Sequence, residues 1–148
     1  MSAEENKARV RDFYEKAVNQ GDLSAVDELV APGEIAHYSG GAIGHDTPES
    51  VKQWVVAIRA AFPDIHVTVE DFLAEGDKLV NRVTYRGTHK GEWTDPVWGR
   101  LAPTGRQVSW MAIAINRFEG GRSVEAWDLM DDSAIWRQLG LIPHPPAA

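Results

Sequence analysis

Apolar and polar residues alternate along much of the second half of the chain, a pattern typical of β-strands that bury one face. Short glycine-containing turns at residues 75–77 and 119–121 separate these segments in pairs. Strands joined by such turns run antiparallel, so the pattern predicts an antiparallel sheet. Four strands are predicted, at residues 65–74, 78–89, 107–118 and 122–130.

The first half of the chain instead carries apolar side chains at helical spacing. A first helix is predicted to begin at Ser2, whose hydroxyl can cap it, and to end at Gly21. A second helix is predicted to begin at Ser24. A third is predicted to have Thr47 as its N-cap and to end at Phe62. The helices therefore precede the main strands.

Shorter segments complete the pattern. Residues 34–38 are a strand candidate, and residues 39–46 are expected to form a glycine-rich loop without the ending of a phosphate-binding loop. Residues 90–106 form a long connection with two tryptophans, which we expect to act as a flap over a pocket. A last helix is predicted to begin at Asp131 or Asp132 and to end at Gly140.

This order of elements predicts an α+β fold class. We expect a strongly curved antiparallel sheet with helices on its concave side, which leaves a pocket between the two layers. Residues 1–143 are expected to form one domain, and residues 144–148 a mobile tail.

Charge and composition narrow the function. The 148 residues include 15 basic and 22 acidic side chains, for a net charge of −7, which argues against nucleic-acid binding. The sequence has no cysteine, so disulfides and thiolate metal sites are excluded. The polar N-terminus and the absence of a long apolar run give no sign of a signal peptide or membrane span, and a cytoplasmic location is expected.

One acid stands inside the last predicted strand. Asp128 lies between Trp127 and Leu129, and a carboxyl group among large apolar side chains tends to have a raised pKa. Asp128 is therefore a candidate proton-transfer group, which we expect to be partly buried in the largest pocket. The alternative is that Asp128 faces solvent. The sequence does not decide which face of the preceding strand it shares.

Six tryptophans in so short a chain suit a cavity lined by aromatic side chains. Trp54, from the third helix, and Trp110, from the sheet, are our candidates for pocket walls that bind substrate. The alternative is that most of the tryptophans belong to an ordinary core.

Several short motifs together carry a resemblance to a known family. They are Gly87-Thr88-His89, Pro103-Thr104-Gly105, Arg117-Phe118 with Gly120-Gly121, the segment 125–131, and Gln138-Leu139-Gly140. In this order and spacing they resemble the SnoaL-like polyketide cyclases, over nearly the whole chain. The resemblance implies the nuclear transport factor 2-like fold, a cone formed by a curved sheet and three helices.

The resemblance also implies roles for individual residues. Asp128 matches the aspartate that acts as general acid and base in the cyclases of this family. His37 matches a polar residue of the first strand that helps to hold the substrate, whereas Ile113 falls where the family has a histidine. Arg82 and His89 match positions that are commonly polar and are further candidates for substrate binding. Alternatively, Arg82 is a surface residue and His89 only bonds the backbone.

The function implied is a cyclase of antibiotic biosynthesis that needs no cofactor and no metal. Asp128 would remove a proton from a carbon between two carbonyls, and the enolate would close a ring by an intramolecular aldol reaction. His37 or Arg82 would stabilise the enolate. Alternatives are an epoxide hydrolase, dehydratase, isomerase or hydroxylase on the same fold, or a protein that only binds a hydrophobic ligand.

The expected partners are a small hydrophobic substrate and further copies of the chain. Both faces of the last two strands are apolar, whereas helices can cover only one, so a homodimer or homotetramer is expected. Neither nucleic acid nor a membrane is an expected partner.

Overall fold

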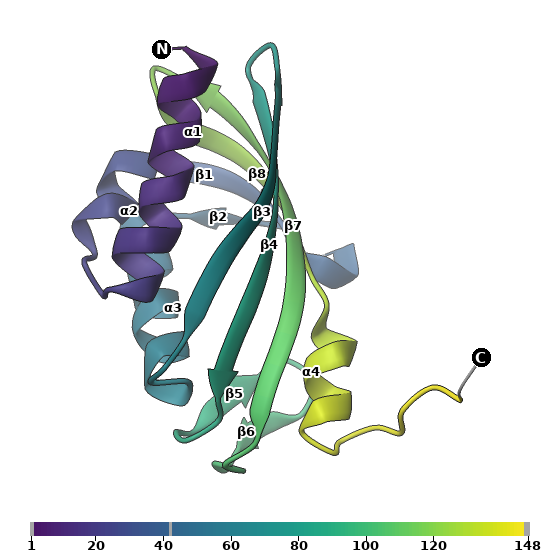
Figure 1. Cartoon of the computed structure of the whole chain (residues 1–148). Helices are drawn as coiled ribbons and strands as arrows, with labels where there is room; N and C mark the ends of the chain where they lie inside the picture. The colour runs from purple at the N-terminus through teal and green to yellow at the C-terminus, as the bar shows by residue number, and fades with distance from the viewer. Residues whose placement is uncertain (1, 42, 147–148) are drawn as a thin grey trace.

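In a computed structural model, which describes residues 2–41 and 43–146, a six-stranded sheet forms the body of the molecule (Figure 1). The strand order is β2-β1-β8-β7-β4-β3, and only β1 and β8 pair in parallel. The strands are β1 Val30–His37, β2 Ile43–Asp46, β3 His66–Glu75, β4 Lys78–Thr88, β7 Gln107–Glu119 and β8 Arg122–Met130. The four main strands thus form the predicted antiparallel sheet.

Three helical segments cover one face of the sheet and a short helix lies on the other (Figure 1). Helix α1 runs over Ala3–Asp12 and continues as a wider-turned π-helix, η1, over Phe13–Asn19. Helices α2, Ser24–Leu29, and α3, Pro48–Ala61, complete the covering layer. Helix α4, Asp132–Gln138, packs against β7 on the opposite face.

The helix ends form where the side chains predict them. Ser2 and Glu5 make a reciprocal capping box at the start of α1, and Thr47 caps α3 through the backbone N–H of Ser50. Asp131, one of the two predicted candidates, accepts the N–H of Ala134 at the start of α4. These local contacts satisfy N–H groups that a helix leaves without partners.

The glycine-rich segment differs from the prediction. Ile43–Asp46 forms strand β2 and pairs with β1, instead of forming a loop throughout. Strand β2 lies at the sheet edge and none of its residues is fully buried. Its sequence therefore lacks the run of apolar residues by which a buried strand is recognised. A short 3₁₀ turn at Ser39–Gly41 precedes it, while Ala42, within the predicted loop, lies outside the described residues.

The long connection after β4 contains a small hairpin. Strands β5, Trp93–Asp95, and β6, Gly99–Leu101, pair with each other. The Asp95 carboxylate accepts the backbone N–H groups of Val97 and Trp98, and it also accepts the Trp136 indole N–H at 2.8 Å. The segment predicted as a flap therefore contains a hairpin, and the hydrogen bond from Trp136 to Asp95 joins this hairpin to α4.

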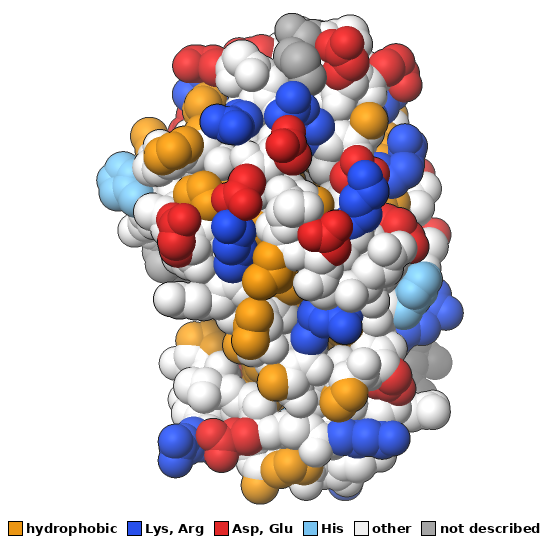
Figure 2. All heavy atoms as spheres, turned by 90° about the vertical axis from the view of Figure 1, so that its left-hand side faces the viewer, with side chains coloured by type: hydrophobic (Ala, Val, Ile, Leu, Met, Phe, Trp, Pro, Cys, Tyr) orange, Lys and Arg blue, Asp and Glu red, His pale blue; other side chains and the backbone are white. Residues whose placement is uncertain are grey.

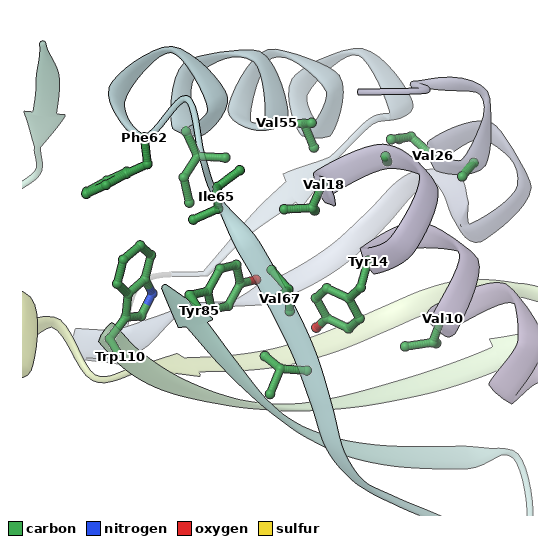
Figure 3. Close-up of a cluster of buried hydrophobic side chains, with 14 of the residues drawn as sticks. Val10, Tyr14, Val18, Val26, Val55, Phe62, Ile65, Val67, Tyr85 and Trp110 are labelled. Carbon is green, nitrogen blue, oxygen red and sulfur yellow. The ribbon is translucent and has the colours of Figure 1, made fainter. Parts of the chain in front are cut away.

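Apolar side chains from the helices and the sheet meet in one core. Val10, Val18 and Val55 of the helical layer face Val67, Tyr85 and Trp110 of the sheet (Figure 3). On the outer side of the helical layer, acidic and basic side chains are interspersed (Figure 2). None of the helices in the described part of the chain is long and apolar enough to cross a membrane.

Gly91 lets the chain after β4 pass close to the end of α3. The N–H groups of Lys90 and Gly91 both donate to the Ala61 carbonyl, and a Cβ atom added at Gly91 would lie 2.0 Å from the Ala60 oxygen. Only a residue without a side chain fits here, and its close approach allows the Ala61 carbonyl at the end of α3 to accept its hydrogen bonds.

Gly91→Ala is expected to lower the free energy of unfolding by about 1–3 kcal/mol, because backbone atoms must move to admit the new methyl group. Urea unfolding measures the loss. Gly44→Ala is the control, because its Cβ would meet only the Tyr38 ring, at an ordinary 3.5 Å. Equal stability of the two variants would contradict this account of the α3 end.

Candidate functional site

Asp128 lies on the concave face of the sheet, beneath the helices. The strand register opposes Asp128 to Ala114 of β7, and Ala114 in turn to Asn81 of β4. Trp110 and Ala112 share this face of β7, because alternate residues of a strand point the same way. The register thus decides the question that the sequence left open.

Three small side chains lie near this carboxyl group in the strand pairing. Ala112, Ala114 and Ala126 lie in the rows next to Asp128. Two surface hollows, of about 420 and 650 Å³, lie elsewhere: one between α1 and α2 and one near the end of β4. Neither of these two hollows borders Asp128, and its place in the largest pocket stays a prediction. Packed aromatic rings occupy much of the interior instead.

Burial changes the acidity of Asp128. Its side chain is only partly exposed, and desolvation, followed by repulsion from the Asp46 carboxylate, raises the pKa of Asp128 to about 6. This agrees with the expectation of a partly buried acid with a raised pKa. Such a carboxyl group can both accept and return a proton near neutral pH.

Aromatic rings form a wall along the same interior. The rings of Tyr85 and Trp110 stack at 5.2 Å, and Trp54 meets Tyr85 edge-on at 6.3 Å. Tyr14 approaches Tyr85 from η1 at 6.4 Å, with the two hydroxyl groups pointing toward one another (Figure 3). The Trp110 indole N–H is buried and has no partner among the described residues. Trp54 and Trp110 thus both pack on Tyr85 at the hydrophobic core, and their role as pocket walls stays a prediction.

A chain of buried polar side chains crosses the interior next to this wall. The Tyr14 hydroxyl donates to Asn81 at 3.0 Å, the Asn81 amide reaches the Asn116 oxygen at 3.5 Å, and Asn116 donates to the Ser123 hydroxyl at 2.9 Å. Sequence reasoning missed these residues. Their signal was a polar residue at an inward position of an otherwise apolar strand.

Three further polar groups come from the β1–β2 edge. The Tyr38 hydroxyl donates to the Asp46 carboxylate, and the Tyr38 ring lies over Gly44. Glu34 is directly opposite Asp46 in the strand pairing and is only 4% exposed. Asp46 was not predicted because its segment was expected to form a loop, whereas Glu34 and Tyr38 lie in the predicted strand at residues 34–38, whose inward face was assigned to His37 instead.

The sequence matches a known protein family. A family model described as SnoaL-like polyketide cyclase matches residues 8–139. The chain belongs to this family. The predicted cone, a curved sheet closed by N-terminal helices, is thereby confirmed.

Solved structures show the same SnoaL-like fold. AclR from Streptomyces galilaeus, a candidate hydroxylase, is 28% identical with a TM-score of 0.81, covering 98% of this chain and 87% of its own. IdmH from Streptomyces antibioticus, a candidate polyketide cyclase, is 31% identical with a TM-score of 0.73, covering 91% and 98%. A SnoaL-like protein from Jannaschia sp. CCS1, 19% identical with a TM-score of 0.79 and covering 97% and 98%, shares the fold. None of the curated proteins matches the sequence.

Two residues expected in the SnoaL-like pocket lie on the outer face of the sheet. The His37 ring stacks on Trp127 at 5.0 Å, and its Nε2 lies 3.0 Å from Glu125. Arg82 pairs with Asp71 at 2.7 Å and opposes Ile113. The proposed substrate contacts of His37 and Arg82 are therefore corrected: each sits one position away from an inward residue of its strand.

His89 is buried at the end of β4. Its Nδ1 lies 3.1 Å from the Thr104 hydroxyl, and its ring packs on Phe62 at 5.4 Å. Burial lowers the pKa of His89, which favours the neutral ring. This placement fits the alternative in which His89 holds the strand end and the returning chain together.

No group of three or more metal-binding side chains occurs among residues 2–41 and 43–146. The buried polar side chains are carboxyl, amide and hydroxyl groups and the His89 imidazole.

Asp128→Asn should stabilise the protein at pH 8 and leave it nearly unchanged at pH 4. The folded-state pKa of Asp128, about 6, lies above its ordinary value of 3.8, so its contribution to stability falls as pH rises from 3.8 through 6. The expected gain at pH 8 is about 1–3 kcal/mol. Urea unfolding at both pH values measures it. Asp77→Asn, an exposed turn residue, is the control, and an equal gain at both pH values would contradict this origin.

Proposed function

We infer that this SnoaL-like protein is a cofactor-independent cyclase in which Asp128 is the general acid and base of an intramolecular aldol ring closure. The observation that carries the inference is the Asp128 carboxyl group, partly buried, with a raised pKa, on the same concave face as an aromatic wall. The substrate class would be a small hydrophobic compound with several carbonyl groups.

The reaction needs only proton transfers by the protein. Ionised Asp128 removes a proton from a carbon between two carbonyls, and the enolate carbon attacks a carbonyl of the same molecule. The new alkoxide then takes the proton back from Asp128, so the enzyme ends as it began. Trp54, Tyr85 and Trp110 would hold the chain folded, so that the two carbons meet.

The enolate would be stabilised by neutral hydrogen-bond donors. The buried polar side chains among the described residues include no lysine or arginine, and Arg82 lies on the outer face. The Trp110 indole N–H is buried beside Tyr85 without a partner, and it is our candidate donor to a substrate carbonyl.

The second candidate function is a hydroxylase, which the similarity to AclR favours. An epoxide hydrolase built on an arginine between two aspartates is less well supported, because Arg82 and Asp128 lie on opposite faces of the sheet. A protein that binds a hydrophobic ligand without turnover is the non-enzymatic alternative.

Asp128→Asn should reduce turnover by about 10²–10⁴-fold and leave ligand affinity nearly unchanged, because it removes the titrating group and keeps its shape. Candidate substrates come from a thermal-shift screen of polycyclic aromatic ketones, which raise the melting temperature if they bind the folded state. Asp77→Asn serves as the matched control. Full turnover in Asp128→Asn would refute the assignment.

A binding protein would respond differently. It would show no turnover with any ligand of the screen, and Trp54→Ala would weaken binding while Asp128→Asn would not. In the cyclase, both variants lower activity, but only Asp128→Asn leaves affinity intact.

We also propose that the outer face of β7 and β8 binds a second copy of the chain. Met111, Ile113 and Leu129 are 40%, 38% and 64% exposed there, beyond the area that α4 covers. Like surfaces of two copies bury such residues against each other in a symmetric dimer.

Leu129→Glu is expected to convert the protein to a monomer, since it places two charges in the buried contact. Sedimentation velocity at micromolar concentration measures the change. Val56→Glu, which alters an exposed residue of α3 on the other side of the molecule, should leave the dimer intact. A monomeric native protein would rule out the dimer.

A further inference from the structure

Glu34 is an acid that the proposed reaction does not use. It lies on β1, its side chain is 4% exposed, and its Oε1 has no hydrogen-bond partner among the described residues. A buried carboxylate without a cation or a full set of donors carries a large desolvation cost. Such a group lowers that cost by keeping its proton.

The groups that face Glu34 come from β2, from β8 and from the residue that follows β1. Asp46 lies opposite it on β2, and Asp128 repels it from β8. Tyr38, which directly follows β1, donates to Asp46. Ser123 of β8 is the donor that favours the charged form of Glu34. Of these neighbours, only Ser123 offsets the two carboxylates.

These surroundings make the two interior acids unequal. Burial, followed in smaller part by the carboxylates of Asp46 and Asp128, raises the pKa of Glu34 to about 7, whereas the pKa of Asp128 is raised to about 6. Glu34 is also the more deeply buried of the two. Because Glu34 is 4% exposed with one oxygen unpartnered among the described residues, whereas Asp128 is partly exposed, we expect Asp128 to ionise first as pH rises and its charge then to oppose the ionisation of Glu34.

A polar route connects Glu34 with the aromatic wall. Ser123 accepts a hydrogen bond from Asn116, which continues through Asn81 to the Tyr14 hydroxyl. Asn81 lies in the same inward row as Asp128. Glu34 and Asp128 thus belong to one interior and not to two separate sites.

We propose that Glu34 is the second proton-carrying carboxyl group of the Asp128 site, which keeps its proton while Asp128 is ionised and so limits this pair to one negative charge. Its part in catalysis rests on the proposed function. When Asp128 takes a proton from substrate, the negative charge moves to the enolate, and neutral Glu34 adds no repulsion. The Glu34 proton is not consumed, so Glu34 is a positioning residue.

The test is a pH titration of carboxyl carbons by nuclear magnetic resonance in the native protein, Glu34→Gln and Asp128→Asn. Glu34→Gln should remove the midpoint near 7 and leave the Asp128 midpoint near 6 almost unmoved, because Glu34 is neutral while Asp128 titrates. Asp128→Asn should lower the Glu34 midpoint by roughly half a unit or more, because it removes a charge that opposes ionisation. Glu75→Gln, an exposed residue, should change neither midpoint.

The reverse asymmetry would overturn the proposal: an Asp128 midpoint that falls in Glu34→Gln, with a Glu34 midpoint that does not move in Asp128→Asn. Independent titration of both groups would overturn it as well. The Asp128→Asn arm leaves Glu34 unaltered, so it decides the question even if Glu34→Gln does not fold. Neither arm requires turnover, and an inactive protein with the expected asymmetry would refute the cyclase but support the charge pair.

Stability provides a second readout. Because the Glu34 pKa is higher in the folded chain than its ordinary value of 4.5, the native protein should lose stability relative to Glu34→Gln as pH rises from about 4.5 through 7. A difference in melting temperature that does not depend on pH would indicate a packing role only and would contradict the proposal.

Discussion

The interior depends on the register in which β8 pairs with β7, because this register opposes Asp128 to Ala114. A shift by one residue would turn Trp127 inward and Asp128 outward, since neighbouring residues of a strand point to opposite faces. The tight turn between Glu119 and Arg122 and the irregularity at Arg117–Phe118 fix the pairing close to one end of the two strands. Strand β7 pairs in turn with β4, so the turn between β7 and β8 helps to position inward residues of three strands.

Removing this many polar groups from water costs free energy. Hydrogen bonds offset that cost for some of these groups and not for others. The amides and hydroxyls from Tyr14 to Ser123 bond to one another, so their burial costs little net free energy. The carboxyl groups of Glu34 and Asp128 have no cation beside them, and their desolvation appears as raised pKa values. Proteins often retain such uncompensated groups where chemistry needs them, at some expense of stability.

Most elements could be predicted from the sequence because their signals are local. Caps such as Ser2 and Thr47, glycine turns and strand alternation depend on neighbouring residues only. Strand β2 escaped prediction because what defines it is its partner, β1. The candidate site was harder for a different reason. His37 and Arg82 are each one residue from an inward position, and a family resemblance does not fix strand parity as a register does. The partial burial of Asp128 and the burial of Trp110 agree with the sequence prediction, whereas their roles at a binding site stay predictions.

Charged side chains have partners of opposite charge on the outer face of the sheet, whereas carboxyl groups lie near one another on the inner face. On the outer face, Glu125 has both His37 and Arg117 as partners, and Lys78 lies 5.5 Å above the Trp127 ring, so charges there are compensated. On the inner face, the charges of Asp46 and Asp128 oppose the ionisation of Glu34, and the charge of Asp46 also opposes the ionisation of Asp128. Such paired charges hold the outer surface in one arrangement. The inner carboxylates instead raise the pKa values of Glu34 and Asp128, and the proton transfer that we propose for the concave side of the sheet depends on this difference.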